Sequence, residues 1–380
     1  FFGVLSIPFL GILSYLVSKN NSFLLTILLI STNIYLIKYS QETRTYTLVF
    51  LLSTINLIFY YKILHLDLTS FKKIYTFSLF VIFSVLSLSA HPFVFIIFFS
   101  QITSSAYSFF VFKNKNFLFL LSIPFILIIY LIINYNYLIS QLSYNEYFLE
   151  HENWKFYYNY YFSRFFGSKI MGLIYLSTLI FLIIRFRKMI LFTSNNYLPL
   201  IFILFFSYII PLFYGFIRLP VLTDRYIIFV LIPIIILISS LIFEISSRKL
   251  KIFLLISIII PTFINNYIEI QFRENTKPEF TKLLNNLESH EIKNLTLHAP
   301  KVIDEIIKNY ILSIKEFKNN NFKIHNIDNI SSDVKMLWVI CYEPVMNFDC
   351  SISSDKQISW ILNETKKLHL LNVKLYEIRN

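Results

Sequence analysis

The sequence predicts a polytopic α-helical membrane protein whose helical part, residues 1–270, is followed by a small extracytoplasmic α/β domain, residues 271–380. Three observations lead to this fold class. Of the 380 residues, 56% are hydrophobic and only 15% are charged. The mean hydropathy is +0.62. Long apolar stretches recur along the chain and stop near residue 270, so the first part needs a lipid environment and the second does not.

Ten apolar stretches are predicted to cross the membrane. Some fall short of the ~20 residues that a helix needs to span a bilayer squarely, so we expect about ten crossings, with flanking aromatic residues at their ends. An even number of crossings returns the chain to the side on which it began. The stretches cover residues 1–17, 21–38, 45–61, 74–89, 92–111, 117–137, 169–184, 197–217, 226–244 and 251–268.

The distribution of Lys and Arg among the connections predicts the orientation. The alternate connections that begin with Lys19 carry more Lys and Arg than those that begin with Lys38. By the positive-inside rule the richer set is cytoplasmic, and we expect a multi-pass protein of the plasma (inner) membrane. The outer side then holds Phe1, residues 39–46, His91, residues 138–168, residues 218–226 and everything after Ile268.

In the C-terminal part, short apolar runs alternate between helical and strand spacing, which is typical of a small α/β layer. The run Met336–Ile340 is apolar throughout and is predicted to be a central strand. The other predicted strands are Asn294–His298, Phe322–Ile327 and Val373–Ile378, and the predicted helices are Pro278–His290, Pro300–Ile311 and Asp355–Leu368.

The net charge of +12 does not by itself indicate a nucleic-acid partner. Lys, Asn, Ile, Phe and Tyr are all abundant, so a general compositional bias explains much of the basic excess. We therefore expect the bilayer, and no nucleic acid, as a partner.

The polar octapeptide at residues 39–46 separates two apolar runs. Charge is costly at the centre of a bilayer, so Glu42 and Arg44 belong at an interface. In an unbroken helix Tyr39, Glu42 and Tyr46 would share one face, while Glu42 and Arg44 would point apart.

Two interpretations of the octapeptide remain open. It can form the rim of an outer cavity, where Arg44 meets a phosphate and Gln41 or Glu42 meets hydroxyl groups. It can also be an interfacial anchor with a snorkelling arginine and an aromatic belt.

Two further outer positions carry candidate binding residues. His91, directly before Pro92, either hydrogen-bonds an acceptor or a headgroup, or is a structural histidine at a helix start. Arg225 and Tyr226 open an apolar stretch after Asp224. Arg225 either holds a phosphate with the help of a helix N-terminus or forms an interfacial ion pair with Asp224.

The outer loop at 138–168 is rich in aromatic and acidic residues, as expected of a lid over a sugar site or of an amphipathic helix in the headgroup region. Glu150, His151 and Glu152 are adjacent rather than at metal-ligand spacing, so we expect no metal. Cys341 and Cys350, the two cysteines of the chain, lie in the outer domain. An oxidising compartment permits a disulfide between them, whereas strand geometry could keep them apart.

The motif Tyr39-Ser40-Gln41-Glu42-Thr43-Arg44-Thr45-Tyr46 after an apolar helix resembles the GT-C class of polyprenyl-phosphate-sugar-dependent membrane glycosyltransferases. The match is to the dolichyl-phosphate-mannose–protein mannosyltransferase type, including its bacterial relatives. Similar segments follow in the same order along almost the whole chain, and they are residues 2–8, 89–93, 224–226 with Pro233, 334–340 and 373–378.

The resemblance implies transfer of a sugar from a polyprenyl-phosphate-linked donor to a lipid, glycan or protein acceptor at the outer face, without a cofactor. The family's acidic residues lie in the first outer loop, which falls before Phe1. We therefore expect the chain to lack its first helix and catalytic loop, and we do not transfer the catalytic role to Glu42. The candidate substrate-binding residues are Arg44, Arg225, Tyr39, Gln41, Glu42, Tyr46, His91 and Tyr226.

Two other functions are alternatives to a glycosyltransferase. A transporter or flippase of a lipid-linked substrate tends to carry charged residues and Gly or Pro breaks near the midplane. Here Gly occurs only 5 times and nearly all charge lies at helix ends, which argues against transport. Composition does not discriminate a non-catalytic membrane scaffold from an enzyme.

Overall fold

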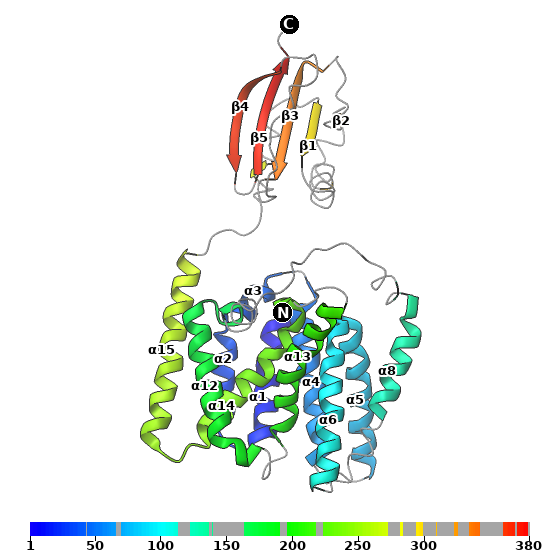
Figure 1. The fold of residues 1–380 in the computed structure, drawn as a ribbon, viewed down its shortest axis with the longest axis vertical. Coiled ribbons are helices and arrows are strands. Elements are labelled where there is room, and N and C mark those ends of the chain that lie inside the picture. Colours follow the sequence, from blue (N-terminus) through cyan, green and yellow to red (C-terminus); the bar gives the residue numbers. More distant parts are fainter. Residues whose placement is uncertain are drawn as a thin grey trace. The chain divides into compact units, whose positions relative to one another are not determined.

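The computed structural model divides into two compact units, a helical unit at Phe1–Phe272 and a sheet unit at Arg273–Asn380 (Figure 1). The residues that the structure describes are 1–42, 44–65, 70–112, 122–136, 139, 163–190, 196–217, 223–272, 282–283, 294–298, 309, 323–325, 334–342, 360–368 and 371–378.

The helical unit consists of long apolar helices joined by short connections. In chain order its described elements are α1 (Phe2–Ser18), α2 (Ser22–Ser31), α3 (Ile34–Ser40), α4 (Tyr46–His65), α5 (Ser70–Ala90), η1 (Pro92–Val94), α6 (Phe95–Phe112), α8 (Ser122–Ile133), α11 (Arg164–Phe166), α12 (Lys169–Lys188), α13 (Leu198–Ile217), η4 (Asp224–Val230), α14 (Leu231–Phe243) and α15 (Arg248–Phe272).

Seven of the described helical segments are long and apolar enough to cross a membrane, or eight if the bent pair α2 and α3 counts as one span. Every one of the ten predicted stretches contains helix, but the count of ten is not confirmed. Helix α1 has 17 residues, α8 has 12, and α2 and α3 meet at an angle of 56°. The bend has a local cause, because the Asn33 side chain accepts a hydrogen bond from Leu36 N–H at 2.9 Å and so starts a new helix inside the apolar run.

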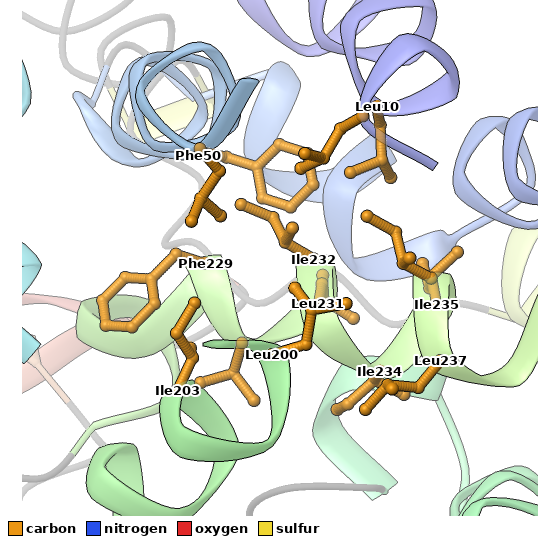
Figure 2. Close-up of a cluster of buried hydrophobic side chains, with 14 of the residues drawn as sticks. Leu10, Phe50, Leu200, Ile203, Phe229, Leu231, Ile232, Ile234, Ile235 and Leu237 are labelled. Atoms are coloured by element: carbon orange, nitrogen blue, oxygen red, sulfur yellow. The ribbon is translucent and has the colours of Figure 1, made fainter. Parts of the chain in front are cut away.

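Helix α14 forms the centre of the helical unit. Its residues from Leu231 to Ile242 are all buried. Figure 2 shows Leu231, Ile232, Ile234, Ile235 and Leu237 clustered with side chains of the surrounding helices, among them Leu10 of α1, Phe50 of α4 and Leu200 of α13. A helix that is apolar on every side is stable only where protein surrounds it.

Large apolar side chains are exposed on the outer helices. In Figure 1 α15 and α8 lie at opposite edges of the helical unit. Phe253 of α15 is 65% exposed and Ile132 of α8 is 70% exposed. So much exposed apolar surface is compatible with a lipid environment and is unusual for a soluble monomer.

Hydrogen bonds gather one group of helix ends around α3. Asn33 Nδ2 donates to Phe165 O at 3.0 Å, and Asn265 Nδ2 of α15 donates to Phe166 O at 3.1 Å. Asn266 Nδ2 of α15 donates to Thr32 O at the α2–α3 bend. We call this group, together with the connection at residues 41–45, the Tyr39 end.

The opposite helix ends form a second group, called here the Glu244 end. Asn20 Nδ2 donates to Glu244 Oε1 at 3.0 Å, and Asn196 Nδ2 donates to Val17 O at 2.8 Å. The two groups are those expected if successive connections alternate between two sides of a layer.

The described strands of the sheet unit form one five-stranded sheet in the order β2-β1-β3-β5-β4. Strand β1 is parallel to β2 and β3, whereas β5 is antiparallel to β3 and β4. Strand β3 is central and buries Leu337, Val339 and Ile340, which confirms the prediction for the run Met336–Ile340. The strands are β1 (Asn294–His298), β2 (Lys323–His325), β3 (Met336–Tyr342), β4 (Trp360–Leu368) and β5 (Leu371–Ile378).

The predicted helix Asp355–Leu368 is wrong over its described part, which is the edge strand β4. The register with β5 shifts between Leu362 and Glu364, so a bulge interrupts the alternation by which a strand is recognised. Ile361 and Leu362, which directly precede the bulge, are both exposed rather than alternating between buried and exposed. The backbone of this segment therefore forms its hydrogen bonds with β5, and not within a helix as the sequence pattern had predicted.

Other predictions for the C-terminal part meet the structure only in part. The predicted helices Pro278–His290 and Pro300–Ile311 lie almost wholly outside the described residues. Cys341 is buried in β3 and is disulfide-bonded. Cys350 lies outside the described residues.

Candidate functional site

The octapeptide forms a turn rather than a continuous helix. Helix α3 ends at Ser40, Gln41 is its C-cap, and α4 begins at Tyr46. The unbroken helix in which Glu42 and Arg44 would point apart is therefore not formed. Instead, Arg44 Nε lies 4.0 Å from Glu42 Oε2, with the Arg44 side chain 57% exposed and that of Glu42 18% exposed.

Aromatic rings from four parts of the helical unit meet beside this turn. The rings of Tyr39 and Tyr46 lie 5.4 Å apart, edge to face. The Tyr46 ring lies 6.4 Å from that of His91, and His91 lies 4.9 Å from Tyr226. We call Tyr39, Tyr46, His91 and Tyr226, with the adjoining Tyr35, Phe93 and Phe165, the aromatic cluster.

The members of the aromatic cluster differ in access. Tyr39 is 8% exposed and Tyr46 is 9% exposed. His91 and Tyr226 are partly exposed. The two tyrosines of the octapeptide therefore support the cluster from within, whereas His91 and Tyr226 can contact a ligand.

His91 is held in one tautomer by the start of the next helix. Its Nδ1 accepts a hydrogen bond from Phe93 N–H at 3.2 Å. Burial lowers the pKa of His91 to about 4, so the imidazole is neutral at physiological pH. A neutral imidazole whose Nδ1 accepts a hydrogen bond carries its proton on Nε2, and Nε2–H is then a donor.

Arg225 brings a positive charge to the aromatic cluster. Its guanidinium carbon lies 5.6 Å from the centre of the Tyr226 ring. Asp224 Oδ1 accepts from the backbone N–H of Arg225 at 3.0 Å. In the described part of the chain the Arg225 side chain forms no ion pair, so the alternative of an Asp224–Arg225 interfacial pair is not formed there.

The structure separates the expected site residues into two groups. Tyr39, Tyr46, His91, Arg225 and Tyr226 come together. Gln41, Glu42 and Arg44 lie on the turn beside them, where Gln41 is exposed.

Sequence reasoning did not assign three neighbours of these residues to the site. The Tyr35 ring lies 4.6 Å from Tyr39 and 4.9 Å from Phe165, and the Phe93 ring lies 5.5 Å from Tyr226. Tyr35 precedes Tyr39 by one helical turn, and that spacing was the available signal. Phe165 approaches only through the tertiary fold.

The chemistry available at this site is the binding of an anion beside aromatic faces. Arg225 provides a permanent positive charge, Nε2–H of His91 provides a neutral donor, and Tyr226 provides a ring face. Among the residues described, no three His, Cys, Asp or Glu side chains lie close enough to hold a metal ion. Most of the loop at 138–168, residues 140–162, lies outside the described part of the chain.

No protein-family model, curated protein or solved structure matches this chain. The geometry and the sequence motifs therefore carry the functional argument.

Proposed function

We propose that this chain is a multi-pass membrane glycosyltransferase that takes a sugar from a polyprenyl-phosphate donor and passes it to a lipid, glycan or protein acceptor. The proposed location is the outer face of the plasma (inner) membrane. One observation carries the proposal. Arg225, with no ion-pair partner in the described chain, lies over the partly exposed Tyr226 ring where apolar helices end. The Tyr226 ring in turn adjoins the partly exposed His91 ring.

Each group in this arrangement matches one part of such a donor. A guanidinium binds phosphate oxygens through charge-assisted hydrogen bonds, and aromatic faces pack against sugar rings. The exposed apolar faces of neighbouring helices suit a polyprenyl chain. The residues named here bind the donor, and none is assigned as the acceptor-activating base.

Arg225 is a better candidate than Arg44 for the donor phosphate. The Arg44 side chain is more than half exposed, so solvent weakens its attraction for an anion. Arg225 is partly buried among rings, where an ionic hydrogen bond is stronger.

Donor binding tests this proposal without requiring turnover. The full chain is placed in lipid nanodiscs and titrated with a labelled polyprenyl-phosphate hexose. We expect Arg225→Ala to weaken binding about 10- to 100-fold, the equivalent of one charge-assisted hydrogen bond. Arg225→Lys should retain part of the affinity, and Arg44→Ala should have a smaller effect than Arg225→Ala.

Arg164→Ala is the matched control, because Arg164 is an exposed arginine in α11 at the same end of the unit. It should bind the donor as the unsubstituted chain does. Equal affinity of the Arg225→Ala and Arg164→Ala chains would refute the proposed donor site.

A further inference from the structure

Exposed cations gather at the Glu244 end, away from the aromatic cluster. Helix α12 ends in a basic turn, and α15 begins in one. The exposed members are Arg185, Arg187, Lys188, Arg248 and Lys249, called here the basic patch. Lys251 is excluded because its Nζ donates to Phe243 O at 2.9 Å.

Helices α12 and α15 run antiparallel, and a hydrogen bond between them sets their register, while a second bond ties α15 to α11, which directly precedes α12. Tyr175 OH lies 3.1 Å from Thr262 Oγ1, and nearer the Tyr39 end Asn265 Nδ2 donates to Phe166 O. Figure 1 shows the two helices side by side. Lys188 follows Tyr175 by as many residues as Lys249 precedes Thr262, so at 1.5 Å rise per residue both basic turns lie at one level.

Described carboxylates do not neutralise the basic patch. Within the described chain none of its five side chains forms an ion pair. Glu244, the acidic residue of the connection between α14 and α15, accepts a hydrogen bond from Asn20 Nδ2. Residues 191–195, which follow α12, contain no Asp or Glu in the sequence.

Apolar side chains continue from the basic patch along the same two helices. On α12, Phe181 is 40% exposed and Ile184 is 61% exposed. On α15, Ile252 is 44% exposed and Phe253 is 65% exposed. Five cations followed by exposed apolar surface provide both features that a phospholipid needs, an anionic headgroup site and a path for acyl chains.

We propose that the basic patch and the adjoining faces of α12 and α15 bind a phospholipid whose headgroup carries two phosphates. Two basic turns at one level, with five cations between them, exceed what a single phosphate can neutralise, whereas two linked phosphates offer one anionic group to each helix end. Basic sites between membrane helices recognise multivalent anionic lipids by this chemistry. The lipid would join α15 to α12 and so stabilise the helical unit.

Lipid titration followed by native mass spectrometry and thermal unfolding tests this proposal. The purified full chain is compared in diphosphatidylglycerol, phosphatidylglycerol and phosphatidylcholine, and with soluble pyrophosphate. We expect diphosphatidylglycerol to bind tightest and to raise Tm. Arg185→Gln with Arg248→Gln should weaken that binding about 25-fold, since each cation near an anionic lipid contributes roughly fivefold.

The matched control is Lys19→Gln with Lys72→Gln, which removes the same charge from exposed residues of other helices at the Glu244 end. Arg185→Lys with Arg248→Lys keeps the charge and should keep most of the binding. The proposal fails if the control weakens binding as much as the arginine pair does. It also fails if phosphatidylglycerol binds as tightly as diphosphatidylglycerol, or if soluble pyrophosphate displaces diphosphatidylglycerol completely.

Discussion

His91 links the fold to the candidate site through a single proton. Its Nδ1 caps the helix that begins at Pro92, and its ring separates Tyr46 from Tyr226. The capping role needs the neutral imidazole. A protonated Nδ1 cannot accept a hydrogen bond from Phe93 N–H.

The lowered pKa of His91 therefore predicts an acid-sensitive fold. The unfolded chain takes up a proton near pH 6.5 and the folded chain near 4, so between these values the unfolded state binds more protons. Stability should fall as pH decreases from 6.5 to 4, by up to about 3 kcal/mol. Thermal unfolding in detergent across this range measures the slope.

His91→Asn is the informative variant for this prediction. An Asn side chain can still accept from the Phe93 N–H but does not titrate. Its stability should match the unsubstituted chain at pH 8 and depend less on pH below 6.5. An unchanged slope in the variant would assign the acid sensitivity to other groups.

Sequence reasoning at this scale found residue types but not their partners. His91 and Arg225 stood out because polar residues are rare between apolar stretches. Both lie against the Tyr226 ring. The approach of His91 to this ring depends on the packing of elements that are distant in the chain, and no local sequence pattern predicts such a contact.

Among the elements, a buried amide pair joins α4, α5 and α6. Asn56 Nδ2 donates to Ser84 Oγ at 2.9 Å, and Gln101 Nε2 donates to Asn56 Oδ1 at 2.7 Å. All three residues are fully buried. Gln101 Oε1 has no partner in the described structure, so the pair is already incompletely satisfied.

Replacing one member of this pair should cost more than replacing both. Asn56→Leu leaves Gln101 without its acceptor and should lower stability by about 1–2 kcal/mol. Asn56→Leu with Gln101→Leu removes both polar groups and should recover most of that loss. Unfolding in mixed detergent measures the stability of the unsubstituted chain, of each single variant and of the double variant, which together form a double-mutant cycle. Additive effects would show that the two amides are energetically independent.

Helix positions were predictable at the element scale, but their interruptions were not. Hydropathy located α4, α12 and α14 because burial in lipid or protein demands long apolar runs. The bend before α3 depends on one capping asparagine, Asn33, inside such a run. The error at β4 has a similar origin, since one bulge near Asn363 hides the strand alternation.

For the whole molecule, the strongest structural regularity is the division of helix ends into two groups. The Tyr39 end holds the aromatic cluster, and the Glu244 end holds the basic patch. Alternating connections and unequal basic content predicted this division from the sequence. Packing does not decide which of the two ends faces outward. The prediction that the Tyr39 end does so rests on the positive-inside rule, in which Lys and Arg near the membrane set the orientation.

Labelling in intact cells tests both the membrane crossing and its direction. Gln41 is exposed at the Tyr39 end, and Ser246 is exposed at the Glu244 end. We expect Gln41→Cys to react with a membrane-impermeant maleimide from outside. Ser246→Cys should react only after permeabilisation, because the bilayer then separates the two ends. The unsubstituted chain gives the background labelling. Reaction of both variants in intact cells would contradict a membrane between the ends, and reversed reactivity would place the aromatic cluster in the cytoplasm and remove an outer-face transferase.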